Sequence, residues 1–460
     1  MPLEEKPNGM ALMRLMMFTV MISSMNAMMM NVVLPQIGRE FHLALAQVSW
    51  LSSAYALIYA FGTVMYGKLA DRFPLKSLLT FGLSLFAAGS LVGLVSQTFG
   101  TALLGRCLQS AGAAALPAMA LIIPVRYFAP DKRGSALSMT AVGTALGGAL
   151  APVVSASIVS IANWRWLFLP SLCMLLLIPL FRKYLEFEPK GAPRPFDWLG
   201  GGLLAASVSF LLLGVTNRDG GYAAAGAASF ILFAVRIRTA REPFVQPAIF
   251  RNAKYTVALA LAFLIAGVGT SLFILTPVLF AGVYGLNAGM IGFAMVPAAA
   301  AAAILGRRGG KLADRKGNFR LYALGSSSII ACFALLSVFA GVPPLWISFI
   351  LIFGNVGQSF VQIAMSNTVS GSLPKEQVGV GMGLFSMTGF LAQGIAAGVY
   401  GIVAAQGARA AWNPLHMVDA GGLFSNIYFV LAVIHIGILL IYRYTFVRRR
   451  SKRREEEVSR

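Results

Sequence analysis

Long apolar stretches alternate with short polar segments along nearly the whole chain. A helix needs about 20 apolar residues to cross about 30 Å of hydrocarbon, and most of these stretches reach that length. The pattern therefore predicts an all-α integral membrane protein with fourteen transmembrane helices. The predicted spans cover residues 12–34, 46–66, 78–97, 101–125, 136–160, 166–182, 198–215, 222–236, 256–283, 288–306, 321–341, 345–366, 380–404 and 423–446.

The composition agrees with a protein surrounded by lipid. Hydrophobic residues make up 58% of the chain and charged residues 12%, whereas a soluble domain has about 25% charged residues. The net charge of +21 would by itself suggest nucleic-acid binding. However, the basic residues lie in the short segments between apolar stretches. We therefore expect the lipid bilayer, and no nucleic acid, as the partner of this surface.

The basic residues also predict the orientation of the chain. With the N-terminus placed in the cytoplasm, 32 of the 37 lysines and arginines fall in cytoplasmic segments, four fall outside and one, Arg106, lies within a span. This asymmetry follows the positive-inside rule, and one missed helix would invert every segment after it. We expect a multi-pass protein of the plasma (cell inner) membrane with both termini in the cytoplasm.

Two loops carry nearly the same sequence. GKLADRFPLK at 67–76 recurs as GKLADRKGNF at 310–319, each after an apolar stretch, which indicates an internal duplication. An ordinary charged turn would explain one copy but not its recurrence. The glycines allow close helix approach, the aspartates can cap or pair at a helix end, and the basic residues supply the opposite charge. These candidate conformational residues are Gly67, Asp71, Arg72, Lys76, Gly310, Asp314 and Arg315.

The fourth and fifth spans carry further candidates. RCLQSAG at 106–112 contains Arg106, Gln109 and Gly112. In the fifth span, small residues recur at helical spacing and allow close helix approach, while a proline among them weakens the helical hydrogen bonds. Plain packing without a gating role is the alternative reading. The stripe consists of Gly143, Gly147, Ala151 and Ser155, and the proline is Pro152.

With these motifs the chain resembles the major facilitator superfamily, and more narrowly its fourteen-helix drug:proton antiporter branch. Pro74, Leu75 and Ser110 depart from the usual residues. The resemblance implies a six-helix half at 1–182, two extra linker helices at 183–254, a second six-helix half at 255–446 and a cytoplasmic tail at 447–460. It also implies a conformational role for the duplicated loops and the fifth span, and a transport or coupling role for the fourth-span residues.

The resemblance places a cargo site near the midplane of the membrane, lined by the first, fourth, ninth and twelfth spans. Polar residues buried in lipid usually face the interior of the bundle. Hydrogen bonding between helices, without cargo contact, is an equally good reading for any one of them. The cavity candidates on these spans and on the second are Ser23, Asn26, Tyr55, Tyr59, Asn355, Gln358 and Gln362.

All 16 acidic residues lie outside the predicted spans. The branch usually has an aspartate where this chain has Asn26, and an amide cannot carry a proton, which also disfavours permanent cations as cargo. His435 is the titratable histidine within a span. Arg106, an arginine within a span, costs about 2.5–3.5 kcal/mol to insert. We therefore expect it to face inward, toward Gln109 and the first span, with snorkelling to the outer headgroups as the alternative.

The resemblance implies a secondary active transporter that exports small amphipathic molecules, such as drugs, antibiotics or metabolites, by alternating access. Coupling to a proton gradient is part of this expectation. The alternatives are a facilitated-diffusion carrier or importer, and a non-transporting membrane sensor on the same scaffold. We expect a monomer, not an enzyme, with small-molecule cargo and protons as partners and with no cofactor or metal. Cargo, direction and coupling ion stay open.

The charge asymmetry predicts that the C-terminus lies in the cytoplasm. A reporter that is active only in the cytoplasm should therefore be active when fused after Arg460, and one that is active only outside should be silent. Activity of the outside reporter alone would reverse the predicted topology.

Overall fold

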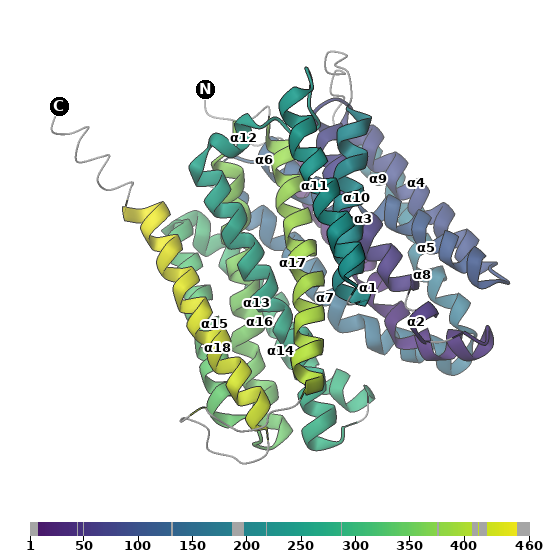
Figure 1. Cartoon of the computed structure of the whole chain (residues 1–460), viewed down its shortest axis with the longest axis vertical. Helices are drawn as coiled ribbons and strands as arrows, with labels where there is room; N and C mark the ends of the chain where they lie inside the picture. The colour runs from purple at the N-terminus through teal and green to yellow at the C-terminus, as the bar shows by residue number, and fades with distance from the viewer. Residues whose placement is uncertain are drawn as a thin grey trace. The chain divides into compact units, whose positions relative to one another are not determined.

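The computed structural model describes residues 8–43, 45–48, 50–129, 132–185, 197–217, 219–286, 288–374, 377–406, 413 and 421–448. Regular structure in these ranges is helical throughout (Figure 1), as the hydrophobic pattern predicts. The chain divides into two compact units. Unit 1 comprises Met1–Pro130, Val142–Ile249 and Leu373–Leu391, and unit 2 comprises Asp131–Ala141, Phe250–Ser372 and Ala392–Arg460. The boundaries of the two six-helix halves, which the resemblance places near residues 182 and 254, stay a prediction.

Unit 1 holds most of the N-terminal helices. They are α1 (Gly9–Glu40), α2 (Leu45–Val48), α3 (Trp50–Ala70), α4 (Leu75–Leu94), α5 (Phe99–Ala113), α6 (Ala115–Tyr127), η1 (Trp164–Phe168), α8 (Leu169–Leu172), α9 (Met174–Tyr184), α10 (Trp198–Asn217) and α11 (Gly220–Thr239). Two long helices, α7 (Arg133–Ile161) and α17 (Val378–Gln406), and the short α12 (Ala248–Arg251) contribute part of their length to each unit.

Unit 2 is built around α13 (Ala253–Tyr284), α14 (Ala288–Lys316), α15 (Asn318–Phe339), α16 (Pro344–Gly371), α18 (Gly422–Arg443) and η3 (Tyr444–Arg448). Helices α15 and α16 pack so closely at Gly325 that a Cβ there would lie 2.9 Å from the Gly357 carbonyl oxygen. On α15, Tyr322 stacks on Tyr442 of α18 with ring centroids 3.5 Å apart. Small residues and aromatic stacks thus hold this bundle together.

The number of membrane spans is confirmed in part. Eleven described helices are long and apolar enough to cross a membrane, and the bent helix α7 would be a twelfth. Helix α10 coincides with a predicted span, but its apolar part, Trp198–Leu211, is shorter. Helix α3 coincides with another predicted span, but its serines and tyrosines lower its hydropathy, so it is not among the eleven. The sequence pattern therefore located these helices correctly, while the total of fourteen spans stays a prediction.

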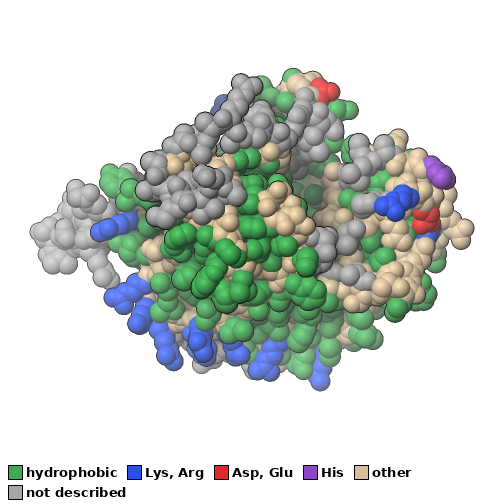
Figure 2. Space-filling model, turned by 90° about the horizontal axis from the view of Figure 1, so that it is seen from below, with side chains coloured by type: hydrophobic (Ala, Val, Ile, Leu, Met, Phe, Trp, Pro, Cys, Tyr) green, Lys and Arg blue, Asp and Glu red, His purple; other side chains and the backbone are tan. Residues whose placement is uncertain are grey.

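The surface of the described residues is strongly apolar. Figure 2 shows hydrophobic side chains over much of one face, with lysine and arginine gathered along an edge. On α11 the side chains of Phe230, Ile231 and Leu232 are more than half exposed. Helix α11 also packs on α10, where a Cβ on Gly214 would lie 2.7 Å from the Ala223 nitrogen. Such a surface suits hydrocarbon, whereas in water it would favour aggregation.

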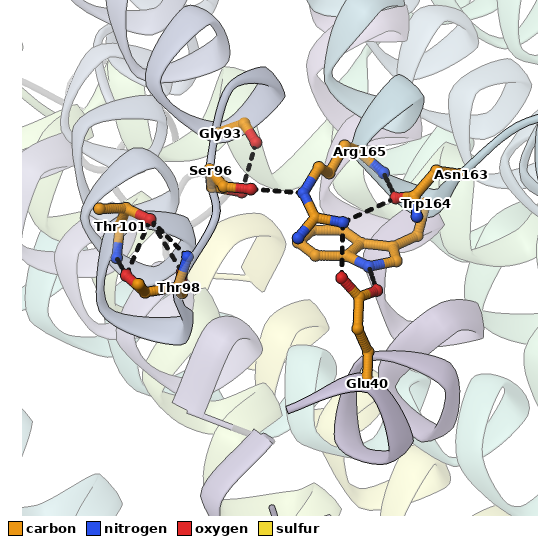
Figure 3. A network of polar contacts seen from close by, with 8 residues as sticks. All are labelled: Glu40, Gly93, Ser96, Thr98, Thr101, Asn163, Trp164 and Arg165. Atoms are coloured by element: carbon orange, nitrogen blue, oxygen red, sulfur yellow. Dashed lines mark hydrogen bonds and ion pairs between the residues drawn. The ribbon is translucent and has the colours of Figure 1, made fainter. Parts of the chain in front are cut away.

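One ion pair joins several segments of unit 1 (Figure 3). Glu40, at the end of α1, accepts a hydrogen bond from Trp164 Nε1 at 2.6 Å and pairs with Arg165 at 2.7 Å. Arg165 also donates to the Ser96 carbonyl oxygen and, at 3.1 Å, to Asn163 Oδ1. Burial acts to raise the pKa of Glu40, but these hydrogen bonds and the Arg165 charge outweigh it, so the pKa lies below its usual value.

This cluster predicts a graded effect of substitutions at Glu40. Glu40→Ala leaves the fully buried indole N–H of Trp164 without its acceptor, which costs about 1–3 kcal/mol. Glu40→Gln keeps an acceptor oxygen and loses only a partly exposed ion pair, worth about 0.2–1 kcal/mol. Thermal unfolding in detergent should rank wild type, Gln and Ala in descending stability. Equal losses for Gln and Ala would show that the charge, not the acceptor, matters.

Candidate functional site

A buried arginine lies at the centre of a polar cluster in unit 1. Helix α5 starts with a capping box, in which the Thr98 side chain accepts from the Thr101 N–H while the Thr98 N–H donates to the Thr101 side chain, both at 3.2 Å (Figure 3). Two turns further along, Arg106 is fully buried. Its Nη1 donates to Asn26 Oδ1 at 2.8 Å and to Gln109 Oε1 at 3.0 Å. The side chain points inward, toward the partners expected from the sequence, and does not snorkel.

Two serines complete this cluster. Asn26 Nδ2 donates to Ser171 Oγ of α8 at 2.7 Å, and Gln109 Nε2 donates to Ser90 Oγ of α4 at 2.8 Å. The arginine is thereby linked through two amides to α1, α4, α5 and α8. Sequence reasoning missed both serines, because nothing in their local pattern distinguishes them from packing residues.

An aromatic row covers the guanidinium. The Arg106 Cζ lies 4.1 Å from the centroid of the Tyr55 ring, a cation–π contact worth about 0.5–2 kcal/mol. Tyr55 stacks on Tyr59 at 5.8 Å, and Tyr59 meets the edge of Phe390 of α17 at 4.7 Å. Ser23 lies near both tyrosine hydroxyls. The structure thus brings together the cavity candidates of the first and second spans with Arg106 and Gln109 of the fourth, and adds Phe390.

Close packing fixes the helices that carry the cluster. A Cβ on Gly112 would lie 2.8 Å from the Cα of Phe86 in α4. In α7, Gly143 and Gly147 pack against the α1 backbone in the same manner, and Ser155 Oγ donates to the Met29 carbonyl oxygen at 3.2 Å. The small-residue stripe is therefore a contact with α1. The side chain of Pro152 lies outside what the structure describes, and a gating role for α7 stays a prediction.

The first duplicated loop holds the start of α17. Asp71 accepts hydrogen bonds from the backbone N–H groups of Gly379 and Val380. A Cβ on Gly67 would lie 2.6 Å from the Gly379 carbonyl oxygen and 3.2 Å from the Cα of Gly383. The glycines allow α3 and α17 to touch, and the carboxylate then meets the positive end of α17.

The second loop repeats this arrangement in unit 2. Asp314 accepts from the backbone N–H of Gly134 at 2.9 Å and of Ser135 at 2.8 Å, at the start of α7. A Cβ on Gly310 would lie 2.6 Å from the Cβ of Ser138. The duplication therefore extends beyond the loop to the helix that it holds. Gly134 and Gly379 are the partners that the loop motif alone did not predict.

The cations around Asp71 differ from the expected ones. Arg126, at the end of α6, and Lys68 act on the carboxyl, whereas the Arg72 guanidinium lies 5.5 Å from the centroid of the Phe73 ring. Burial raises the pKa of Asp71 to about 6, although both cations and the N–H groups of α17 act against it. Arg315 is exposed and Lys76 half-buried, and their predicted roles stay open.

Three cavity candidates belong to α16 of unit 2. Asn355 is half-buried and donates to the Leu351 carbonyl oxygen at 3.1 Å. The Gln358 amide lies against Gly269 of α13, and its Oε1 is buried without a hydrogen bond from the described residues. Gln362 is exposed. These side chains do not form one cluster within unit 2, and their contact with cargo stays a prediction.

Two further points concern chemistry in the described part of the chain. His435 of α18 is fully buried, and neither ring nitrogen has a hydrogen bond there. No group of three or more His, Cys, Asp or Glu among the described residues is arranged to hold a metal.

Comparisons place the chain among known proteins. The model of the Major Facilitator Superfamily matches residues 16–397. Multidrug resistance protein 3 of Bacillus subtilis (strain 168) is 28% identical over 331 residues, which are 68% of this chain and 63% of that protein. Riboflavin transporter RibZ of Clostridioides difficile (strain 630) is 22% identical over 370 residues, 79% of this chain and 81% of that one. The chain thus spans less than two thirds of the multidrug relative.

The fold has solved counterparts. The crystal structure of the human organic anion transporter MFSD10 (TETRAN) matches with a TM-score of 0.69 at 14% identity, over 94% of this chain and all of that one. At this identity the likeness shows the fold alone.

The raised pKa of Asp71 predicts how the start of α17 responds to pH. A carboxyl that ionises near 6 in the contact, and near 3.9 in water, favours the contact when protonated. The contact is therefore most stable at low pH and weakens as the pH rises through about 6. Amide exchange at Val378–Gly383, corrected for its intrinsic rate, should be slow at pH 5 and several-fold faster at pH 7.

Asp71→Asn supplies the matched control, because it keeps an acceptor but cannot ionise. Its exchange at the start of α17 should stay slow at both pH values, and exchange at the start of α7, held by Asp314, should be unchanged. Faster exchange at pH 5 in the wild type would mean that the carboxylate hydrogen bonds outweigh burial.

Proposed function

We propose that this chain, which belongs to the Major Facilitator Superfamily, is a secondary active transporter that exports small amphipathic molecules by alternating access. The family and the relatives are transporters and not enzymes, and the many apolar helices make the chain a multi-pass membrane protein. Export, the class of cargo and coupling to the proton gradient belong to the proposal. So do the plasma membrane as location, both termini in the cytoplasm and a monomeric state.

The observation that carries the proposal is the pair of equivalent aspartate contacts. Asp71 binds the first backbone N–H groups of α17, and Asp314 binds those of α7. Alternating access requires contacts that hold in one conformation and release in another. A carboxylate on a helix start suits this role, because its hydrogen bonds are strong when made and are replaced by water when released. We assign both residues to conformational cycling rather than to cargo binding.

Export of amphipathic molecules is supported by the relatives and by the extra helices. One relative is named for multidrug resistance and another for riboflavin, so related chains carry different cargo. Helices α10 and α11 fall within 183–254, the segment that the resemblance assigns to two linker helices. We place cargo at the cluster of Arg106, Gln109 and Asn26 with its aromatic cover, and the polar residues of α16 stay separate candidates for cargo contact.

A facilitated-diffusion carrier is the second candidate, favoured by one observation. The amide of Asn26 occupies the position beside Arg106 where a proton-carrying acid is usual in the resembling branch, and it is fixed between Arg106 and Ser171. A carrier without energy coupling would need no titrating group there. The two candidates differ in their response to imposed gradients.

Inside-out vesicles containing the chain test the proposal directly. Uptake of fluorescein, Nile red and ethidium, which are anionic, neutral and cationic, would be followed under a pH gradient and under a membrane potential, imposed separately. We expect accumulation against a gradient for at least one dye, several-fold above that in vesicles without the chain. Because none of the described acidic residues contacts Arg106, ethidium should be accumulated least.

Each other outcome has a defined meaning. Equilibration without accumulation would favour the facilitated-diffusion carrier. Accumulation only in vesicles of the opposite orientation would indicate an importer. No movement of any dye or of riboflavin under either gradient would contradict transport and favour a sensor.

A further inference from the structure

The positive charge of Arg106 has no negative partner in the described part of the chain. The acidic residues described there hydrogen-bond or pair with other groups or lie elsewhere, and none contacts the Arg106 side chain; they are Glu40, Asp71, Asp197, Asp219, Glu242 and Asp314. The predicted spans contain no acid. A fully buried cation held only by neutral groups is unfavourable unless something else supplies the opposite charge.

Around Arg106 there is a hydrogen-bond donor that has no acceptor. Both amide oxygens, of Asn26 and Gln109, already accept from Nη1, and both amide nitrogens already donate to serines. The Nε group reaches only the Leu51 carbonyl oxygen, at 3.5 Å. The Nη2 group is buried and has no partner among the described residues. A group that would complete this site must therefore accept hydrogen bonds.

The tyrosine over the guanidinium supplies a second open position. The Tyr55 hydroxyl is buried and lies near the Ser23 hydroxyl, and no other side chain among the described residues hydrogen-bonds to it. Its backbone is held in place, because Ser110 Oγ donates to the Tyr55 carbonyl oxygen at 2.5 Å. The ring is held between Arg106 and Tyr59, so its hydroxyl lies at a defined position beside the guanidinium.

We propose that the Arg106 cluster is an anion site, which binds a monovalent carboxylate or halide through Nη2 of Arg106 and the Tyr55 hydroxyl. Two donors and one full positive charge match such a group, and hydrogen bonds from a guanidinium to an anion are strengthened by the charge. The inference rests on the proposed function only for the claim that the bound anion is carried. If the bound anion is the cargo, the cargo has an acidic group. If it is a small inorganic ion, that ion is transported together with the cargo.

Binding can be measured without transport, by thermal unfolding of the purified full chain in detergent. Sodium benzoate is the carboxylate probe, benzamide its neutral match and sodium chloride the inorganic probe. A ligand that binds the folded chain raises the unfolding temperature in a saturable manner. We expect a saturable rise with benzoate and none with benzamide. A matching rise with chloride identifies a site for any small anion, and none with chloride identifies a carboxylate site.

Three variants connect the response to the cluster. Asn26→Asp places a carboxylate where Arg106 already bonds, so it should raise the unfolding temperature without added anion and lower the apparent benzoate affinity at least tenfold. Arg106→Gln removes the charge and should abolish the response. Asn31→Asp adds the same charge at an exposed position of α1, where the side chain accepts from Ser52 at 2.5 Å. It should respond as the wild type does.

The proposal would be overturned by an absent benzoate response in the wild type, by an equal response to benzamide, or by an undiminished response in Asn26→Asp. Should Arg106→Gln fail to fold, the comparison of Asn26→Asp with Asn31→Asp still decides. Anion binding without any transport in vesicles would refute the proposed function and leave the anion site standing. Transport without anion binding would refute the anion site and leave the proposed function standing.

Discussion

Hydrocarbon offers no hydrogen-bond partner, and this constraint underlies every polar feature of the chain. Backbone groups must pair within helices, so the regular structure of the described residues is helical throughout. Side chains must pair across helices, which requires the helices to come close, and small residues allow this. Gly112 against Phe86 and Gly147 against α1 are such approaches. The hydrogen bonds from Arg106 to Asn26 and Gln109 depend on the helix positions that this packing sets.

At the helix ends water can supply hydrogen bonds, so the constraint set by hydrocarbon is weaker there. The two aspartate contacts lie at such ends. At Asp71 two tendencies oppose each other: burial disfavours the charged carboxyl, while nearby cations and the N–H groups of α17 favour it. Desolvation by the surrounding chain prevails and raises the pKa to about 6, and we propose that this allows the contact to be released near neutral pH. The equivalent hydrogen bonds of Asp314 show that duplication copied the arrangement, not only the sequence.

The sequence predicted what depends on periodicity and on neighbours along one helix. Span positions, the duplicated loops and the pairing of Arg106 with Gln109 at one helical turn follow from spacing alone. Partners that come from distant segments could not be predicted. Arg126 rather than Arg72 acts on Asp71, and Gly134 meets Asp314, because topology brings these segments together. Ser90, Ser171 and Phe390 were missed for the same reason. Helices α3 and α10 show where hydropathy fails to decide the number of spans, because α3 is partly polar and the apolar part of α10 is short.

The exchange of a carboxylate for the amide of Asn26 changes the energetics of the whole site. With an acid beside it, Arg106 would carry its own counter-charge, and a proton could displace the arginine to drive a cycle. With an amide, the counter-charge must arrive with the ligand. An exporter of anions has a driving force that needs no titrating residue, because moving one charge through 100 mV is worth about 2.3 kcal/mol. In a cell with a negative interior this favours the outward movement of anions, about a 50-fold accumulation. Under the proposed anion site, the lack of an acid in the predicted spans and the unbalanced charge of Arg106 have one explanation: the bound anion serves as the counter-ion, and the membrane potential adds to the proposed proton gradient in driving its export.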